Sequence, residues 1–200
     1  MKFWKHFKTI TKHKWYVLDG CLRVGLVWQG LTHDLSKYSR IEFWTSARFY
    51  QGTRSPIFAE RTEKGYSEVW MHHKGRNPHH FEYWTDWNPE TGQYVPKPMP
   101  RRYLVESIMD RRAASMVYQG KEYRPDSALN YYLSHAESKL IHPKTQREME
   151  YILRMLAEKG ERETFAYIKT NVLTGKPFPW EENPLLAQAG SHFPSENKED

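Results

Sequence analysis

His33 and Asp34 stand next to each other in the segment Thr-His-Asp-Leu-Ser-Lys, between positions 32 and 37. Other residues with metal-binding side chains lie before and after this pair. They are His13, the histidine cluster His72, His73, His79 and His80, and Asp110. Neutral imidazole nitrogens and carboxylate oxygens together form a ligand set that divalent transition metals accept. The sequence therefore predicts a metal site held inside a helical bundle.

Helices are the elements expected to position these ligands. Apolar and aromatic side chains recur every three to four residues along most of the chain, as on the buried face of a helix. The expected helices cover about residues 2–18, 32–50, 58–74 with an interruption at Gly65, 101–118, 125–136, and 145–169 with a break at Gly160. The mostly apolar segment 21–31 is expected to be a buried helix or a helical turn that leads into the His-Asp pair.

His79 and His80 are expected at the start of a further short helix. Asn77 and Pro78 precede them, and Asn followed by Pro is typical of a helix cap and the first helical position. This helix would run through Trp84. Its two histidines would then face the histidine pair that ends the preceding helix, across one tight turn.

Prolines mark the segments that are not helical. A first cluster, between Trp87 and Pro100, favours a turn or a small hairpin. A second, from Pro177 to Pro194, indicates an extended tail with a charged end. We therefore predict an all-α fold, a helical bundle with a short irregular or hairpin insertion. Residues 1–169 would form the domain, and residues 170–200 the extended C-terminal tail.

The composition is typical of a folded chain in a reducing compartment. Aromatic residues make up 15% of the 200 residues, which is too many for a disordered chain. The single cysteine, Cys21, allows no internal disulfide and fits the cytoplasm. The sequence has no uncharged apolar run of about 18 residues, the length that could span a membrane, and its basic N-terminus lacks the apolar segment of a signal peptide. We therefore expect a cytoplasmic protein without a membrane partner.

The formal net charge of +6 suits a partner that carries phosphate groups. The lysines and arginines are scattered along the chain, as on a solvated surface, so nucleic acid is possible but not favoured over a small phosphorylated substrate. A Gly-rich phosphate loop, a Gly-x-Ser-x-Gly elbow and a Cys-x-x-Cys pair are all absent from the sequence. This excludes P-loop, serine-hydrolase and zinc-ribbon sites.

The order of His13, the pair His33 and Asp34, a later histidine cluster and Asp110 resembles the HD superfamily of metal-dependent phosphohydrolases. The resemblance covers about residues 2–120. In that superfamily an early histidine, the adjacent His-Asp pair and a late aspartate bind one metal ion. The segments Thr-His-Asp-Leu-Ser-Lys, His-His-Lys-Gly-Arg-Asn-Pro-His-His and Pro-Met-Pro before a helical aspartate also look like an uncharacterised branch found in bacteria and their phages.

The resemblance also implies a second ion. In two-metal members the aspartate of the pair, here Asp34, bridges both ions, and additional histidines hold the second one. His73 and either His79 or His80 match those additional ligands by their order in the chain. Only six positions separate His73 from His79, where two-metal relatives usually have a whole helix. The sequence therefore supports the first ion more directly than the second.

The expected catalytic residues are Asp34, Lys37 and His80. One or two ions of Mn, Fe, Co, Ni or Zn would lower the pKa of bound water and offset charge on a phosphoryl group. Lys37 corresponds to a lysine that several two-metal members place near the substrate's phosphate, with Arg76 and Arg112 as further phosphate-binding candidates. A histidine, His80, would protonate the leaving oxygen. The resemblance thus implies hydrolysis of a phosphate ester or anhydride, with a nucleotide as the favoured substrate class.

Two other functions remain open. In the superfamily, members with four histidines, two aspartates and a lysine after the pair can hold two irons and use dioxygen to cleave carbon bonds. A non-enzymatic phage or bacterial protein could instead retain the scaffold and bind a partner or nucleic acid through its basic surface and tail. The oligomeric state is open too.

The remaining acids and histidines receive more ordinary roles. Glu42 and Glu82 are candidates for additional acids near the site, although a solvated helix face is the commoner place for Glu42. The other histidines are expected at the surface or as capping groups. They are His6, His135, His142 and His192.

Overall fold

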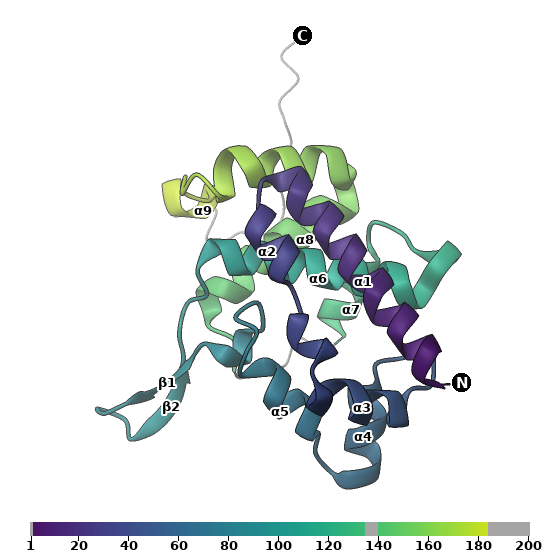
Figure 1. The fold of residues 1–200 in the computed structure, drawn as a ribbon. Coiled ribbons are helices and arrows are strands. Elements are labelled where there is room, and N and C mark those ends of the chain that lie inside the picture. Colours follow the sequence, from purple (N-terminus) through teal and green to yellow (C-terminus); the bar gives the residue numbers. More distant parts are fainter. Residues whose placement is uncertain (1, 135–139, 184–200) are drawn as a thin grey trace.

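The computed structural model describes residues 2–134 and 140–183, and these form a bundle of helices with one small hairpin (Figure 1). The helices are α1 (Lys2–Val24), α2 (Val27–Thr32), α3 (Arg40–Phe49), α4 (Pro56–Lys64), α5 (Glu68–Lys74), α6 (Arg101–Gln119), α7 (Ser127–Leu133), α8 (Pro143–Tyr167) and α9 (Pro179–Glu182). Short 3-10 helices cover Leu35–Tyr38, Phe81–Tyr83 and Gly120–Glu122. The all-α fold class is therefore confirmed.

Helix α6 lies at the centre of the core and packs against α1, α7 and α8. Its fully buried Leu104 and Ile108 meet Val17 from α1 and Ile152 from α8 in one apolar cluster. Burial of such side chains stabilises the fold by roughly 1.5–3 kcal/mol each. The packing brings α1 and α6, which carry His13 and Asp110, into direct contact.

Helix α1 is longer than the sequence predicted. The sequence placed its end at about residue 18, but the helix continues through Asp19 and Gly20 to Val24. Gly20 serves close packing instead, because a Cβ atom there would lie 2.7 Å from the Sδ atom of Met109 on α6. Glycine at this position lets the two helices approach each other, and the helix ends before Gly25, whose φ is 89°.

The helix predicted over residues 32–50 is interrupted at the His-Asp pair. The chain forms α2, a break at His33 and Asp34, the 3-10 helix Leu35–Tyr38, and then α3, for which the Ser39 side chain provides the N-terminal cap. Asp34 has φ 53° and ψ 27°, the left-handed conformation. It is the one non-glycine residue with positive φ in the described ranges, and such strain is concentrated at functional sites.

Helices α4 and α5 confirm the predicted interruption at Gly65, whose φ of 81° ends α4. The helix predicted from His79 through Trp84 is wrong. His79 lies in a turn, His80 is extended with φ −90° and ψ 130°, and only the 3-10 helix Phe81–Tyr83 follows. The extended backbone at His80 prevents a continuous helix.

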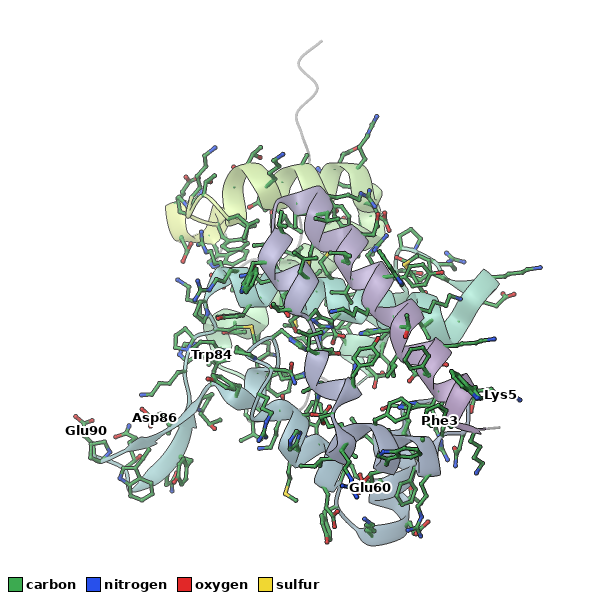
Figure 2. All side chains as sticks on the ribbon, viewed as in Figure 1. Phe3, Lys5, Glu60, Trp84, Asp86 and Glu90 are labelled. Carbon is green, nitrogen blue, oxygen red and sulfur yellow. The ribbon has the colours of Figure 1, made fainter. Side chains whose placement is uncertain are left out.

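The segment predicted as a hairpin does form one. Strands β1 (Thr85–Asn88) and β2 (Gln93–Pro96) pair antiparallel, with Trp87 opposite Tyr94, and the hairpin projects from the bundle (Figures 1 and 2). The predicted break at Gly160 is present as a non-helical residue within α8.

The ordered chain extends past residue 169, where the sequence placed the end of the domain. A π-helical turn covers Ile168–Val172, and α9 follows. Phe178 is buried, and its ring lies 5.7 Å from that of Tyr151. Residues 170–183 are therefore part of the packed structure, and the rest of the predicted tail, 184–200, lies outside the described residues. Within the described ranges, none of the helices combines the length and apolar character that crossing a membrane requires.

Candidate metal centre

Side chains from distant parts of the chain meet in overlapping groups of metal-binding residues, and two of these groups share Asp34. The first group contains His13, His33, Asp34 and Asp110. The second group contains Asp34, His73, His79 and His80. In each group the ligand atoms all lie within 4.8 Å of one another. The structure thus brings the six predicted ligands together, and Asp34 belongs to both groups.

The two carboxylate oxygens of Asp34 face different groups. Its Oδ2 atom lies 3.1 Å from Nε2 of His33 and 3.7 Å from Nε2 of His13. Its Oδ1 atom lies 3.2 Å from Nε2 of His73 and 3.4 Å from Nε2 of His79. One carboxylate therefore stands between two pairs of imidazoles, with one oxygen for each pair.

Asp110 completes the first group from α6. Its Oδ1 atom lies 2.9 Å from Nε2 of His13 and 3.5 Å from Nε2 of His33. Helices α1 and α6 pack against each other, and this contact brings the side chains of His13 and Asp110 together. This group therefore offers two imidazole nitrogens and two carboxylate oxygens.

Two buried glutamates orient the histidines by contacting Nδ1, whereas Nε2 of each ring faces Asp34. Glu106 Oε1 lies 2.9 Å from Nδ1 of His33 and 3.1 Å from Nδ1 of His79. Glu42 Oε2 lies 2.8 Å from Nδ1 of His73. When Nδ1 carries the proton and donates a hydrogen bond to a carboxylate, the lone pair is left on Nε2. The nitrogens that face Asp34 are then in the state that metal binding requires.

The Asp34 loop is held in place by hydrogen bonds from neighbouring elements. Lys14 of α1 donates to the backbone carbonyls of Leu31 at 2.8 Å and His33 at 2.9 Å. On the other side, Asn77 donates to Ser36 Oγ at 2.9 Å. These bonds support the left-handed backbone of Asp34 and fix the direction of its side chain.

The carboxylates and imidazoles shift one another's protonation. Burial alone would lower the pKa of His33, but neighbouring carboxylates, first among them Asp34, outweigh burial and hold this pKa well above its ordinary value. Burial alone would raise the pKa of Asp34, but His33 and Lys37 hold it well below the usual range. Hydrogen bonds from histidines lower the pKa of Asp110 in the same way, against its burial. The carboxylates of the site are therefore ionised, and buried negative charge needs positive charge close to it.

When the imidazoles are neutral, the protein supplies less positive charge than is needed to balance the carboxylates. Four carboxylates gather here, and two ammonium groups, those of Lys37 and Lys14, lie near them, which leaves two negative charges uncompensated. The carboxylates are those of Asp34, Glu42, Glu106 and Asp110. Uncompensated charge inside a protein is strongly unfavourable, and protons on the imidazoles or metal cations would balance it.

The unpaired atoms of the site fit a metal ion. Nε2 of His13, His33 and His79 and the Oδ1 atom of Asp34 are buried without a hydrogen-bond partner in the described structure. Metal bonds of about 2.1 Å place neighbouring ligand atoms roughly 3.0–3.5 Å apart. Most separations between these nitrogens and oxygens fall in or near this range, so the groups could hold a metal ion.

Of the other residues predicted to be catalytic, Lys37 lies beside these groups and His80 belongs to the second group. The ammonium of Lys37 forms an ion pair with Asp34 Oδ2. Burial opposes its charge, but Asp34 and Asp110 hold the pKa of Lys37 above its ordinary value. His80 has a buried Nε2 atom without a hydrogen bond, and burial together with nearby His79 holds its pKa well below the usual value.

The two predicted phosphate-binding arginines have other surroundings. Arg112 is buried, and its Nε donates to Glu161 Oε1 at 2.5 Å, which ties α6 to α8. This structural ion pair replaces the role that the sequence suggested for Arg112. Arg76 lies just after α5, where its Nη1 donates to the carbonyl oxygen of His72 at 3.3 Å. Within the described part of the chain, neither guanidinium group forms an ion pair or a side-chain hydrogen bond with a residue of the two ligand groups.

Sequence reasoning missed Glu106 altogether, favoured a solvated helix face for Glu42 over the alternative near the site, and expected His6 at the surface. Glu42 is buried rather than solvated, and it accepts hydrogen bonds from two histidines of α5. His6 is 3% exposed rather than at the surface, with its ring 5.3 Å from that of Phe43. Glu106 had a readable signal, because it lies one helical turn before Asp110 and must share its face.

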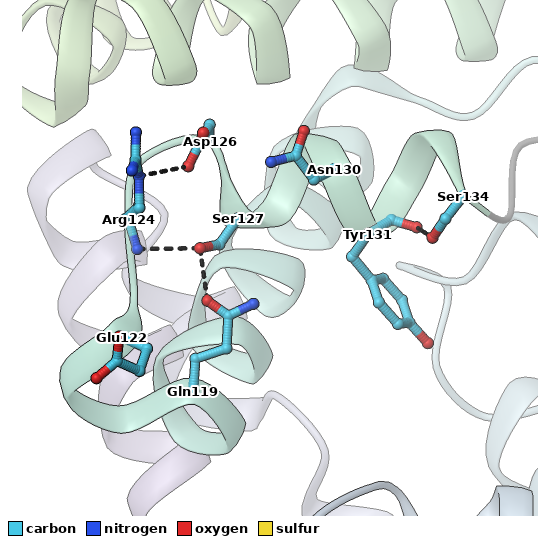
Figure 3. Close-up of a pocket in the computed structure, with 8 residues that line it drawn as sticks. All are labelled: Gln119, Glu122, Arg124, Asp126, Ser127, Asn130, Tyr131 and Ser134. Carbon is cyan, nitrogen blue, oxygen red and sulfur yellow. Dashed lines mark hydrogen bonds and ion pairs between the residues drawn. The ribbon is translucent and has the colours of Figure 1, made fainter.

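A separate polar pocket of about 560 Å³ lies at the end of α6 and the start of α7 (Figure 3). Its side chains are bound to one another. Ser127 Oγ donates to Gln119 Oε1 at 2.5 Å, and Arg124 pairs with Asp126 at 3.4 Å. None of the metal-binding residues lines this pocket.

Comparison with known proteins places the chain in a family but does not assign it a reaction. No curated protein and no solved structure matches it. The model of a family of unknown function (DUF5662) matches residues 2–155, which include every residue of both ligand groups. The chain belongs to this family of unknown function.

Proposed function

We propose that the protein is a metal-dependent phosphohydrolase of the HD type, acting on a nucleotide or a related phosphate ester or anhydride. The observation that carries the proposal is the position of Asp34. Its Oδ2 faces His13 and His33, and its Oδ1 faces His73 and His79. A carboxylate shared in this way suits two ions held close together, an arrangement typical of phosphoryl-transfer enzymes.

Each residue of the centre has a defined part in this proposal. Divalent ions of Mn, Fe, Co, Ni or Zn would supply Lewis acidity toward water and toward a phosphoryl oxygen. Lys37, whose pKa is raised by Asp34 and Asp110 against burial, would stay charged and bind a phosphate oxygen. His80, with an unpaired buried Nε2, would exchange a proton with the leaving oxygen. Glu42 and Glu106 would keep the imidazoles oriented.

Elemental analysis of purified wild-type protein and of the Asp34→Asn variant tests the proposal. Asparagine tolerates the left-handed backbone of this position, so the variant removes charge without adding strain. We expect up to two ions per wild-type chain, and loss of both from the variant. With the metal found, the wild type should hydrolyse members of a panel of nucleotides and phosphoesters, and the variant should lose that turnover.

Asp86→Asn is the matched control, because Asp86 is an exposed carboxylate on the hairpin far from the ligand groups. It should keep both metal and turnover. Asp110→Asn should lose the first ion and keep the second. Retention of metal and hydrolysis by Asp34→Asn would overturn the proposal, whereas metal without any turnover of phosphate compounds would overturn only the hydrolase assignment.

The number of imidazoles favours one second candidate, a di-iron oxygenase of the HD type. Four histidine nitrogens lie around one shared carboxylate, a nitrogen-rich set that suits iron. Iron content, absorbance in the visible region and turnover that stops without dioxygen would favour this candidate. Turnover of a phosphoester that continues without dioxygen would favour hydrolysis.

A further inference from the structure

Helix α1 has a second nonpolar face that points away from the core. Its buried residues, among them His13 and Val17, lie on one side. On the opposite side Trp4 is 64% exposed and Trp15 is 65% exposed, and Leu22 continues the same line. Positions 4, 15 and 22 fall within a few tens of degrees of one another around a helix. The outward stripe of α1 therefore exposes three large apolar side chains, where a solvated helix would be polar.

Helix α2 widens this stripe into a surface. A Cβ atom on Gly30 would lie 2.9 Å from Cδ1 of Leu18, so α2 rests directly on α1. From α2, Trp28 is 72% exposed, and Leu31 is exposed beside it. We call these residues the aromatic face. It consists of Trp4, Trp15, Leu22, Trp28 and Leu31.

The charges around the aromatic face are positive. The first 18 residues contain five lysines and no acidic residue. Lys5, Lys8 and Lys12 are exposed and flank the stripe of α1, and Figure 2 shows Lys5 at the N-terminal end of this helix. The first acid, Asp19, lies 3.6 Å from Arg23, an ion pair that offsets its charge.

We propose that the aromatic face binds the surface of an anionic phospholipid bilayer, with α1 and α2 lying in the plane of the interface. Tryptophan favours the boundary between headgroups and acyl chains, and leucine gains from burial among the chains. Lysines at the rim would pair with anionic headgroups. The sequence argued against a membrane partner because it lacks a spanning segment, whereas this mode of binding needs none.

The same features weigh against two other occupants. A second copy of the chain would bring the lysines that flank α1 against the same lysines of its partner, and like charges at close range repel. Single-stranded nucleic acid would stack on the tryptophans, but it would leave Leu22 and Leu31 without a favourable contact. A bilayer accommodates both the aliphatic and the aromatic side chains.

Sedimentation with lipid vesicles tests the proposal on the full chain. We expect binding to vesicles of phosphatidylcholine mixed with phosphatidylglycerol, and much weaker binding to phosphatidylcholine alone. The Trp15→Ser/Trp28→Ser variant should bind at least about tenfold more weakly, a loss that corresponds to roughly 1.4 kcal/mol. Replacement of Lys5, Lys8 and Lys12 by alanine should weaken binding by about fivefold for each lysine removed.

Trp87→Ser is the matched control, because Trp87 is equally a surface tryptophan but lies on the hairpin. It should bind vesicles as the wild type does. Unchanged circular dichroism and metal content would show that the variants remain folded, and neither readout depends on the proposed hydrolase activity.

Three results would overturn the proposal. The first is absence of binding to the anionic vesicles. The second is equal binding by wild type and Trp15→Ser/Trp28→Ser. The third is that the same variant instead abolishes a dimer or the binding of a single-stranded oligonucleotide while vesicle binding is unchanged.

Discussion

At the scale of single residues, Glu106 connects the two ligand groups. It contacts His33 of the first group at 2.9 Å and His79 of the second at 3.1 Å, in both cases at Nδ1. One carboxylate thus sets the tautomer of two imidazoles. Its negative charge would also strengthen both imidazoles as ligands, so its effect on metal affinity should be felt at both ions.

We therefore expect Glu106→Gln to lower metal affinity by about 10- to 100-fold. The amide can still accept a hydrogen bond, but it lacks the charge that strengthens the imidazole as a ligand. Competition with a chelator of known affinity measures the change. Glu90→Gln, on the hairpin, is the control and should not alter affinity. Equal affinities for Glu106→Gln and wild type would show that Glu106 does not support the ligands.

His6 provides a pH-dependent term in stability. Burial, together with the charge of Lys37, lowers the pKa of His6 from 6.5 to about 4, and both ring nitrogens are buried without a hydrogen bond. The unfolded chain therefore binds a proton at His6 more readily than the folded chain does. Above pH 6.5 the contribution of His6 to the free energy of unfolding does not change with pH. As the pH falls toward 4, this contribution becomes increasingly destabilising.

We expect the His6→Leu variant to lose less stability on acidification than the wild type. The difference between the two should grow to about 3 kcal/mol between neutral pH and pH 4, from the shift of the His6 pKa. Urea unfolding of both proteins at a series of pH values, with chelator present, measures it. Parallel pH profiles of the two proteins would contradict the assignment.

The candidate ligands could be predicted from the sequence, whereas the residues that support them mostly could not. His33 and Asp34 were recognisable because the pair is adjacent, and His13 and Asp110 because they match a known order. Glu42 supports His73 from a helix 31 positions earlier, and no local pattern indicates such a contact. His6 shares the face of His13, seven residues on, and this spacing was the available sign of its burial.

At the scale of the elements, the contact between α1 and α2 determines where the Asp34 loop begins. Gly30 lies within this contact, three residues before His33. A Cβ atom there would lie 2.9 Å from Cβ of Cys21 and 3.3 Å from Cα of Leu18. The second neighbour is backbone and cannot rotate away, so α2 must shift to accommodate a larger residue.

Gly30→Ala should therefore destabilise the protein by about 1–3 kcal/mol, as overpacking does elsewhere. Metal affinity should fall as well, because the shift of α2 displaces His33. Chemical denaturation and metal titration measure the two effects. Gly75→Ala is the control, since its nearest neighbour would be a carbonyl oxygen at an ordinary 3.5 Å. If Gly30→Ala has the stability and the metal affinity of the wild type, the contact between α1 and α2 does not require glycine at this position.

Local spacing predicted most helices but failed where tertiary contacts override it. The apolar repeat located α6 and α8 nearly to the residue, and the proline cluster located the hairpin. Asp19 and Gly20 have the composition of a turn, yet the packing of Gly20 against Met109 keeps them helical. No glycine or proline at Asp34 indicates the break in the helix there. Hydrogen bonds from Lys14 and Asn77, which lie outside this segment, hold the loop in place.

At the scale of the whole molecule, the centre joins otherwise separate parts of the chain. Its ligands come from α1, the loop after α2, α5, the turn after α5, and α6. A bound ion would hold α5 against the α1 and α6 core. Metal binding should therefore stabilise the entire fold, because the unfolded chain cannot present these groups together.

Adding the native metal at about 100 times its dissociation constant should stabilise the protein by about 2.7 kcal/mol. Thermal unfolding with metal and with chelator measures this effect as a shift of Tm. Asp34→Asn, which removes the shared ligand, should unfold at the same temperature in both conditions. A wild-type Tm that does not respond to any of the candidate metals would contradict a metal centre in this position.

The shared carboxylate also restricts how the centre can change during evolution. Substitution of His73 or His79 removes partners from Oδ1 of Asp34 and leaves those of Oδ2 in place. Substitution of Asp34 removes a residue of both ligand groups in one step. Family members that have been reduced to a single ion are therefore expected to retain aspartate here long after their outlying histidines have diverged.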